Sequence, residues 1–269
     1  MPTNNNILVN NSNYEKVLDP KYGDNGIVID FYQDSDTDKE NGCGISCAIE
    51  SNDVLLYSVG NLSRKALECE GIAEMFFSEP LVYSTFANGK PVDKLVTLER
   101  LKRECKLFEQ GNPYSKYSIF DKENEFVGRI VLEGCDDPHP ETGEDMGGIA
   151  EIGIAITTTK QRKGFGTDAV AGITYGLAAY LSGYRGGDGN ADSYPITHEK
   201  FNGESEQLEL ISLYATASPQ NGTYKIFDRC GYNLGSTYTH GKYKQQRTEF
   251  QLSVKEIVAV CERSKLKFT

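Results

Sequence analysis

The sequence predicts a mixed α/β domain, in which helices pack on a mixed β-sheet. Apolar runs of strand length alternate with longer helix-like segments, polar turns join strand-like runs into antiparallel pairs, and a glycine-rich turn links one such run to a long helix. With 269 residues, 38% of them hydrophobic, the chain is long enough to bury one sizeable core.

Residues 1–52 are expected to form an N-terminal extension. The first part, residues 1–25, is rich in Asn and other polar groups, a composition typical of disorder. Two apolar runs follow at 26–32 and 44–50, on either side of an acidic segment. They predict either a hairpin or extra strands laid on the main sheet.

Residues 53–254 are expected to form the main domain, and residues 255–269 a C-terminal helix. The expected strands are 54–59, 114–121, 125–134, 147–157, 207–217, 232–240 and 247–254. The expected helices are 62–77, 91–111, 166–184 and 221–231, with a long polar loop at 185–206. In the second helix, apolar residues recur at spacings of three and four, which predicts one apolar face made of Leu95, Leu98, Leu101, Cys105 and Phe108.

The charge balance bears on the partners that the protein could bind. The chain has 28 Lys and Arg against 39 Asp and Glu, a net charge of −11. Nucleic acid is not expected as a partner, because neutralising phosphates needs a basic face. A cationic substrate suits this charge better.

The cysteines and histidines mark no metal or disulfide site. The seven cysteines are scattered and odd in number, which favours reduced thiols in a cytoplasmic protein. Cys43 and Cys47 have no second pair at ligand spacing, and the chain holds three histidines, so no zinc site is expected. No apolar run approaches the length of a membrane helix, and no secretory signal is visible at the N-terminus.

The turn TTTKQRKGFGT, residues 157–167, has the composition of an anion-binding loop. A helix N-terminus offers unpaired N–H groups and a partial positive charge, and glycines let an anion approach the backbone. Lys160, Arg162 and Lys163 add cationic charge, and Thr167 adds a hydroxyl donor. The turn is therefore expected to bind a phosphorylated ligand, with an ordinary loop at the start of a helix as the alternative.

A dinucleotide is not the expected ligand. Gly164, Gly166 and Ala169 satisfy the spacing G-x-G-x-x-A, but about six polar residues separate the strand from the first glycine. The helix is also followed by a polar loop, where the dinucleotide fold requires a second strand ending in an acid.

The segment AEIGIAITTTKQRKGFGTDAV resembles the central motif of the GNAT superfamily of acyl-CoA N-acyltransferases. That motif, [QR]-x-x-G-x-[GA], follows a strand and opens a helix. The resemblance is closest to the branch of ribosomal-protein N-terminal acetyltransferases. The matching residues are Ala150, Glu151, Ile152, Gly153, Gln161, Lys163, Gly164, Gly166 and Thr167.

A second segment, SPQNGTYKIFDRCGYNLGS, resembles the later motif of the same superfamily. There N-x-x-S precedes a short helix that ends E-K-x-G-[FY]. Thr223 takes the place of the Ser, Asp228 that of the Glu and Arg229 that of the Lys. The loop before the helix is one residue shorter than the family pattern, which leaves Asn221 as the Asn of this segment.

The resemblance implies a GNAT-type fold: a strongly bent mixed sheet, helices on both faces, and a splayed pair of parallel strands. It also implies acetyl-CoA as co-substrate, with its pantetheine arm between the splayed strands and its diphosphate on the turn. The residues implied to bind it are Ala155, Ile156, Thr157, Gln161, Arg162, Lys163, Gly164, Phe165, Gly166, Thr167, Asn221 and Thr223.

Two residues are implied to take part in acyl transfer to an amine. Glu151 lies on the strand where several family members carry a general base, with a structural carboxylate, bonded to the backbone or facing solvent, as the alternative reading. The tyrosine that usually protonates the leaving thiolate is replaced here by Phe227. Tyr224, one turn earlier, either takes over this role or serves in packing, with the thiolate leaving unassisted.

The expected activity is an acetyl-CoA-dependent N-acetyltransferase that works by direct attack in a ternary complex. The acceptor would be a cationic amine, such as a protein amino group or a polyamine, since acidic residues crowd segments 133–145 and 185–206. The alternative interpretation is that these acidic residues only form a solvated loop surface. The other function considered is a CoA-binding regulatory or interaction protein without catalysis. A monomer or homodimer is expected.

Overall fold

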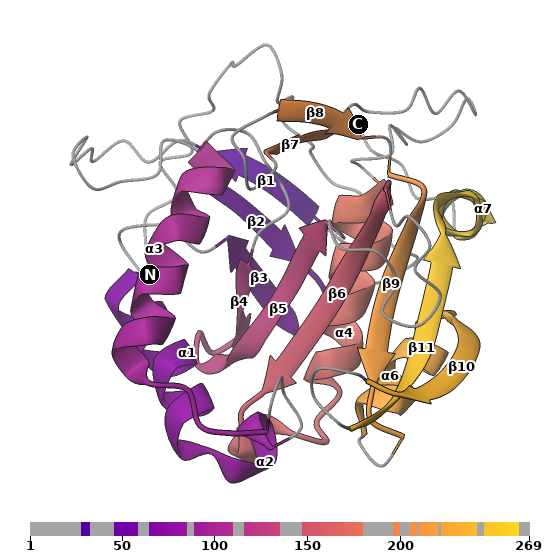
Figure 1. Cartoon of the computed structure of the whole chain (residues 1–269). Coiled ribbons are helices and arrows are strands. Elements are labelled where there is room, and N and C mark those ends of the chain that lie inside the picture. Colours follow the sequence, from indigo (N-terminus) through magenta and orange to yellow (C-terminus); the bar gives the residue numbers. More distant parts are fainter. Residues whose placement is uncertain are drawn as a thin grey trace.

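A computed structural model of the chain describes part of its residues (Figure 1). The described ranges are 28–32, 46–58, 65–84, 89–109, 116–134, 147–179, 196–199, 205–208, 210–219, 222–240 and 245–263. The segment 1–25, which the sequence predicts to be disordered, and Asn221 lie outside these ranges.

One nine-stranded sheet organises the described part of the chain. Its strand order is β1-β2-β3-β4-β5-β6-β9-β11-β10. The strands are β1 (Val28–Tyr32), β2 (Ser46–Glu50), β3 (Val54–Ser58), β4 (Lys116–Asp121), β5 (Phe126–Gly134), β6 (Ile149–Ile156), β9 (Ser212–Ala217), β10 (Asn233–Thr239) and β11 (Gln246–Ser253). Neighbouring strands are antiparallel except β6 and β9, which are parallel. The sheet is therefore mixed, and the antiparallel pairs predicted at β4–β5 and β10–β11 are confirmed.

The parallel strands β6 and β9 pair over only three residues before they separate. Ladder pairing joins Ile149 to Ser212 and ends at Glu151 and Tyr214, although both strands continue. Figure 1 shows the two strands close at their beginnings and well apart at their arrowheads. The splayed parallel pair that the family resemblance implies is confirmed.

Helices cover both faces of the sheet. They are α1 (Lys65–Ser78), α2 (Pro80–Tyr83), α3 (Lys94–Glu109), α4 (Phe165–Ala171), the π-helical continuation η2 (Gly172–Ala178), α6 (Thr223–Arg229) and α7 (Val254–Arg263), with the short turn η1 (Thr158–Lys160). The α4–η2 helix, α6 and α7 share the larger hydrophobic cluster with the sheet. Residues of α1, α2 and α3 form a second cluster with Ala155 of β6 and Phe126 of β5.

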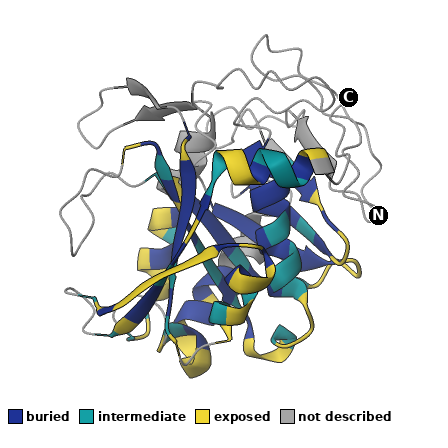
Figure 2. Ribbon diagram, turned by 90° about the vertical axis from the view of Figure 1, so that its right-hand side faces the viewer, coloured by how far each residue is buried: buried dark blue, intermediate teal, exposed yellow. Residues whose placement is uncertain are grey.

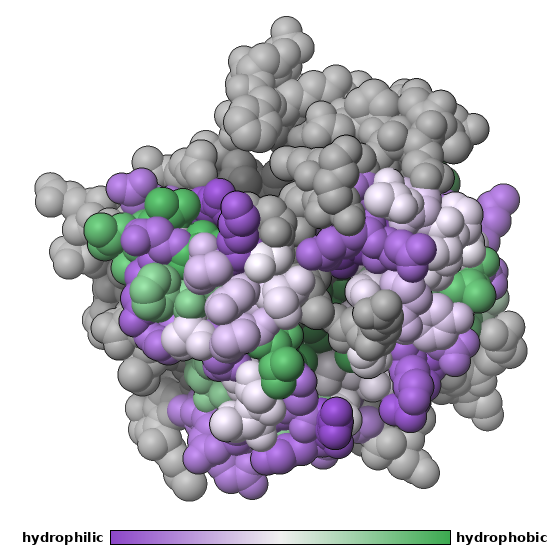
Figure 3. Space-filling view, turned by 60° about the horizontal axis from the view of Figure 1, so that its bottom comes forward, coloured by the Kyte–Doolittle hydropathy of each residue, from purple (hydrophilic) through white to green (hydrophobic). Residues whose placement is uncertain are grey.

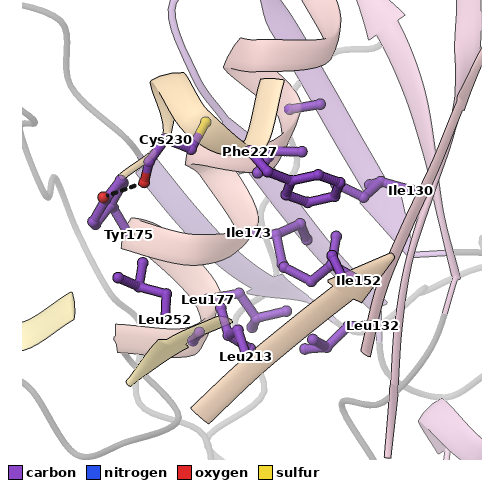
Figure 4. Close-up of a cluster of buried hydrophobic side chains, with 14 of the residues drawn as sticks. Ile130, Leu132, Ile152, Ile173, Tyr175, Leu177, Leu213, Phe227, Cys230 and Leu252 are labelled. Atoms are coloured by element: carbon purple, nitrogen blue, oxygen red, sulfur yellow. Dashed lines mark hydrogen bonds between the residues drawn. The ribbon is translucent and has the colours of Figure 1, made fainter. Parts of the chain in front are cut away.

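The larger cluster forms because inward-facing side chains alternate along the central strands. Figure 4 shows Ile130, Ile152 and Leu213 meeting Ile173 of the helix and Phe227 of α6. Figure 2 shows the buried residues concentrated in the central strands and on the helix surfaces turned toward them. Strand β10, at the edge of the sheet, is mostly exposed.

The N-terminal strands belong to the main sheet. Strands β1 and β2 pair with each other as an antiparallel hairpin, and β2 also pairs with β3. Both alternatives that the sequence left open therefore hold together: the hairpin exists, and it extends the sheet. Ile49 of β2 is fully buried in the larger cluster.

Three expectations from the sequence are wrong in detail. The segment 185–206 is not all loop, because β7 (Ile196–Glu199) pairs with β8 (Ser205–Leu208) as a separate hairpin. The strand expected at 207–217 is accordingly divided, and β9 begins at Ser212. Leu95, expected on the apolar face of α3, is 71% exposed, whereas Leu101 is buried.

None of the described helices combines the length and apolar character that a membrane crossing requires. Within the same ranges, no group of three or more His, Cys, Asp or Glu side chains is placed to hold a metal ion.

Candidate active site

The open side of β6 presents unpaired backbone groups toward β9. Thr157 donates its N–H to the carbonyl of Val127, 2.9 Å away on the β5 side. Because hydrogen-bonding direction alternates along a strand, the N–H and C=O groups of Ile154 and the N–H of Ile156 point the other way, into the gap, whereas the carbonyl of Ile156 on that side accepts a bond from Gln161. Beyond Glu151 the described part of β9 does not pair with them. An extended ligand with amide groups could pair with them as an added strand would.

The gap opens at the end of the molecule that carries the glycine-rich turn. Figure 3 views the molecule from that end and shows a hollow with hydrophobic atoms recessed near its centre. Gln161 folds back over the end of β6 and donates from Nε2 to the carbonyl of Ile156, at 3.0 Å. The turn therefore follows directly from the open strand edge.

Three carboxylates, of Glu79, Asp121 and Glu125, fix the first part of the turn. The N–H and hydroxyl of Thr158 both donate to Oε2 of Glu79, at 2.6 and 2.7 Å. Lys160 forms ion pairs with Asp121, at 2.6 Å, and with Glu125. Hydrogen bonds to these two carboxylates raise the pKa of Lys160. The expectation that Lys160 adds charge for a phosphate is therefore wrong, because its charge is used inside the protein.

The second part of the turn is open to solvent. Arg162 has φ of 63° and Gly164 has φ of 92°, so two residues of the left-handed region lie close together. Such a backbone turns successive N–H groups toward one concave side, where an anion binds. The side chains of Arg162 and Lys163 are exposed beside it, and a Cβ at Gly164 would meet open space. Gly164 thus has the conformation and access that the sequence predicts.

Gly166 serves a different purpose from Gly164. It is buried, and a Cβ built on it would lie 2.7 Å from Cδ1 of Ile226 in α6. The absent side chain lets α4 pack closely on α6. Phe165 packs against the larger cluster, and the carbonyl of Thr167 accepts a bond from the thiol of Cys230, at 3.5 Å. Of the two glycines, only Gly164 is therefore accessible to an anion; Gly166 is buried.

Thr157 carries a buried polar atom that nothing in the described chain satisfies. The residue is 8% exposed, and its Oγ1 atom has no hydrogen-bond partner among the described residues. An unpaired buried hydroxyl is costly, so a ligand that supplies a partner would be favoured there. Thr157 lies between the end of β6 and the start of the turn.

Asp168 ties the first turn of α4 to the turn between β2 and β3. Its carboxylate accepts the hydroxyl of Ser51 at 2.5 Å, and the N–H groups of Asp53 and Val54 at 2.6 and 3.1 Å. We call these three bonds the Asp168 clasp. The clasp joins the helix that begins at the glycine-rich turn to the N-terminal strands.

Glu151 lies on the face of the sheet that carries α1 and α3, beside the point where β6 and β9 separate. It is directly opposite Glu133 on β5 and beside Tyr214 on β9. No hydrogen bond or ion pair holds its carboxylate within the described ranges, and the residue is exposed. The surrounding protein nevertheless limits hydration of the carboxylate and raises its pKa to about 7; the charge of Glu133 adds to the shift, and Arg247 opposes it.

The neighbouring Tyr214 stays neutral and firmly held. Its hydroxyl donates to Oε1 of Glu249 at 3.2 Å and lies 3.4 Å from the hydroxyl of Tyr238. Burial is the first cause that raises the pKa of Tyr214. Glu249 also accepts the hydroxyl of Ser236, at 2.9 Å. This network forms one wall beside Glu151.

Helix α6 lies on the opposite face, near the end of β9. Phe227 is 1% exposed and stacks on Phe250, with ring centroids 5.3 Å apart. Tyr224 is half-buried, with its ring edge against the same Phe250 at 5.2 Å. Thr223 opens the helix and is half-buried. Packing therefore accounts for part of the Tyr224 side chain, while its role in catalysis stays a prediction.

Sequence reasoning did not single out Tyr214 or Asp168. Tyr214 is placed beside Glu151 by the parallel register of two strands that are distant in sequence. Asp168 sits inside the recognised motif segment, but its partners Ser51 and Asp53 come from the N-terminal part of the chain. An acid in the first turn of a helix was the one local signal for Asp168.

The fold, with its gap between β6 and β9, is similar to that of solved acetyltransferases of the GNAT family, as the motifs predict. An acetyltransferase of the GNAT family from Bacillus anthracis matches with a TM-score of 0.50 and 16% identity, over 78% of this chain and 99% of its own. A ribosomal-protein-S5-alanine acetyltransferase from Vibrio fischeri matches with a TM-score of 0.52 and 12% identity, over 78% and 97%.

A third solved structure holds coenzyme A. It is a ribosomal L7/L12 α-N-protein acetyltransferase in complex with coenzyme A, with a TM-score of 0.50 and 12% identity, over 77% of this chain and 97% of its own. At sequence identities of 12–16%, the similarity to these structures shows a shared fold only. No protein-family model and no curated protein sequence matches the chain.

Proposed function

We propose that the protein is an acetyl-CoA-dependent N-acetyltransferase that transfers the acetyl group to a primary amine by direct attack in a ternary complex. The observation that carries the proposal is the open edge of β6, which leads directly into an exposed turn with two residues of positive φ and two cations, Arg162 and Lys163. A solved protein of the same fold holds coenzyme A, which is in keeping with this assignment.

The residues present fit coenzyme A. Its pantetheine amides would pair with the open edge of β6 around Ala155, Ile156 and Thr157, and the unpaired hydroxyl of Thr157 would gain a partner. The diphosphate would lie on the turn from Gln161 to Thr167, against first-turn N–H groups and the cations of Arg162 and Lys163. Thr223 would contact the cofactor from the other side of the gap; Asn221, which the motif also implies, lies outside the described residues.

Glu151 would serve as the general base. An amine attacks a thioester only in its neutral form, and an amine of lysine type is mostly protonated at neutral pH. A carboxylate with a pKa near 7 can accept this proton far better than one of ordinary pKa. The absence of a hydrogen bond to the carboxylate from any described residue argues against the alternative reading as a structural carboxylate bonded to the backbone.

The other steps use groups around the strand end. The backbone N–H of Ile156 would polarise the thioester carbonyl as the tetrahedral intermediate forms. Collapse of that intermediate releases the CoA thiolate, which takes a proton from Tyr224 or from water. The net reaction turns an ammonium and acetyl-CoA into the acetylated amine, CoA thiol and one proton.

A protein N-terminal amine is the acceptor that we favour within the class of cationic amines. Two of the structures of similar fold are ribosomal-protein acetyltransferases. The acids of segments 135–145 and 185–195, which would attract a cation, lie outside the described residues.

Calorimetry with acetyl-CoA and thiol release over a panel of amines and peptides test the proposal. We expect binding at micromolar concentration and thiol release that depends on the amine. Replacing both Arg162 and Lys163 with Met should weaken acetyl-CoA binding about tenfold or more, since two cations beside the diphosphate are lost. Lys90→Met and Lys122→Met remove exposed charges elsewhere and are the control. Indifference to millimolar CoA would refute the proposal.

A CoA-binding regulatory protein is the second candidate, and one observation favours it. Phe227 occupies the position of the usual proton donor and is buried in aromatic contacts. Binding of acetyl-CoA without thiol release for any amine would select this candidate.

A further inference from the structure

Strands β4, β5 and β6 bring three charged side chains into one row beside the gap. Lys116 of β4 lies 3.5 Å from Glu133 of β5, and Glu133 is directly opposite Glu151 of β6. The Lys116 side chain is 10% exposed and that of Glu133 is 56% exposed. The row therefore runs from a buried cation, through a half-exposed carboxylate, to the carboxylate that we assign as the base.

The Glu133–Glu151 pair is unfavourable on its own. Side chains directly opposite on antiparallel strands lie roughly 5 Å apart at Cβ, and like charges in that position repel. The described chain gives Glu151 no hydrogen bond to offset the repulsion. Uptake of a proton by Glu151 relieves it, so the position of Glu133 makes Glu151 a stronger base.

The other ionisable groups on this face act on Glu151 less directly. On β11, Arg247 lowers the proton affinity of Glu151, whereas Glu249 is engaged with Tyr214 and Ser236. The phenols of Tyr214 on β9 and Tyr238 on β10 lie beside that network. Among the described residues of the face, Glu133 is therefore the anion placed to raise the basicity of Glu151.

We propose that Glu133 is a positioning residue for the reaction: its charge sets how readily Glu151 takes up the acceptor proton, and Lys116 sets how much of that charge Glu151 experiences. Only the effect on catalysis rests on the proposed function. The underlying electrostatic arrangement can be measured in the protein alone.

The step that this arrangement assists is the transfer of one proton. The ammonium of the acceptor gives a proton to the Glu151 carboxylate, so that an ammonium and a carboxylate become an amine and a carboxylic acid. The amine nitrogen then has the lone pair that attacks the thioester carbon. Before the transfer the two carboxylates carry two negative charges, and afterwards they carry one.

The test compares two charge changes of opposite sign. Glu133→Gln removes the repelling anion, so the pKa of Glu151 should fall by on the order of one unit. Lys116→Met removes the cation that partly neutralises Glu133, so the pKa of Glu151 should rise. Glu133→Asp keeps the charge and should restore most of the wild-type value. Glu123→Gln, an exposed acid in the turn between β4 and β5, is the matched control and should change nothing.

The first measurement is a pH titration of ¹³C-carboxyl NMR signals in Glu-labelled protein without ligands. The Glu151 signal is the one that Glu151→Gln removes, and its midpoint in wild type should lie near 7. Opposite shifts in Glu133→Gln and Lys116→Met support the inference. An unchanged midpoint in Glu133→Gln, or shifts of the same sign in both variants, would overturn it. If Lys116→Met does not fold, the Gln and Asp variants of Glu133 decide the matter.

The second measurement is the pH profile of kcat/KM. The acid limb should move to lower pH in Glu133→Gln and to higher pH in Lys116→Met, while the KM for acetyl-CoA stays the same. A purely structural role for the ion pair would not move the limb in opposite directions. Shifts in the NMR titration with no activity in wild type would instead count against the proposed function.

Discussion

At the scale of single residues, the environment of Glu151 makes stability depend on pH. Its pKa in the folded protein is raised to about 7 from an ordinary value of 4.5, first by the limited hydration of the carboxylate and then by Glu133. A carboxyl with a raised pKa binds its proton more tightly in the folded state. Its contribution is therefore most favourable at low pH and is lost as pH rises from about 4.5 to about 7.

Replacing Glu151 with Gln should therefore stabilise the protein at pH 8 and have little effect at pH 5. Gln has the shape of the neutral acid but cannot ionise. Thermal unfolding of both proteins across this pH range measures the effect. Equal midpoint differences at the two pH values would contradict the assigned environment of Glu151, whatever the catalytic role of the residue.

The two glycines of the turn show what could and could not be predicted at this scale. The motif predicted an exposed turn with positive φ, and Gly164 has both properties. It could not show that Gly166 is needed for the contact with Ile226, because that contact joins segments about 60 residues apart. The ion pairs of Lys160 were missed for the same reason: the cation was visible, but its partners Asp121 and Glu125 were not.

At the scale of elements, the Asp168 clasp couples helix α4 to the N-terminal strands. Asp168→Asn keeps the shape of the side chain but replaces one accepting oxygen with an NH₂ group, which cannot accept the N–H groups of Asp53 and Val54. Loss of bonds to a charged acceptor should destabilise the protein by about 2 kcal/mol.

Amide hydrogen exchange can show where Asp168→Asn loosens the structure. The amides of Asp53 and Val54 should exchange faster in Asp168→Asn, and acetyl-CoA should bind more weakly because the first turn of α4 is less well fixed. Asp228→Asn, an exposed acid of helix α6, is the control. Unchanged exchange at both amides would show that the clasp does not hold the turn between β2 and β3.

The order of most strands and helices was predictable because each has a local pattern of apolar residues. The hairpin β7–β8 was missed since its sequence is polar and resembles a loop. The register between paired strands could not be predicted, because it depends on how the whole sheet packs. Nothing in the sequence places Glu133 opposite Glu151, or Tyr214 beside Glu151.

At the scale of the whole molecule, the N-terminal strands are part of one sheet and one core. Ile49 of β2 is fully buried and lies against Gly172 of the helix, where a Cβ would meet its Cγ2 atom at 3.5 Å. Without the hairpin, β3 would become an edge strand with Val54 and Leu56 uncovered. We therefore propose that the boundary predicted at residue 53 does not divide the chain into two units that fold independently.

A chain that begins at Asp53 should consequently fold poorly. We expect it to self-associate on size-exclusion chromatography and to unfold at a lower denaturant concentration than the full chain. A monomeric product with the same unfolding midpoint would contradict this and would support residues 1–52 as a separable extension.

The early separation of β6 and β9 also places two sheet edges in the interior of the molecule rather than at its rim. An edge with free backbone groups recruits any extended chain, including another copy of the same protein. Terminal edges can be protected by charged or short strands, but these internal edges must stay open if a ligand is to enter. An extended ligand bound between β6 and β9 would cover these edges and so protect the protein from aggregation. We therefore expect the protein to be more soluble when that ligand is present.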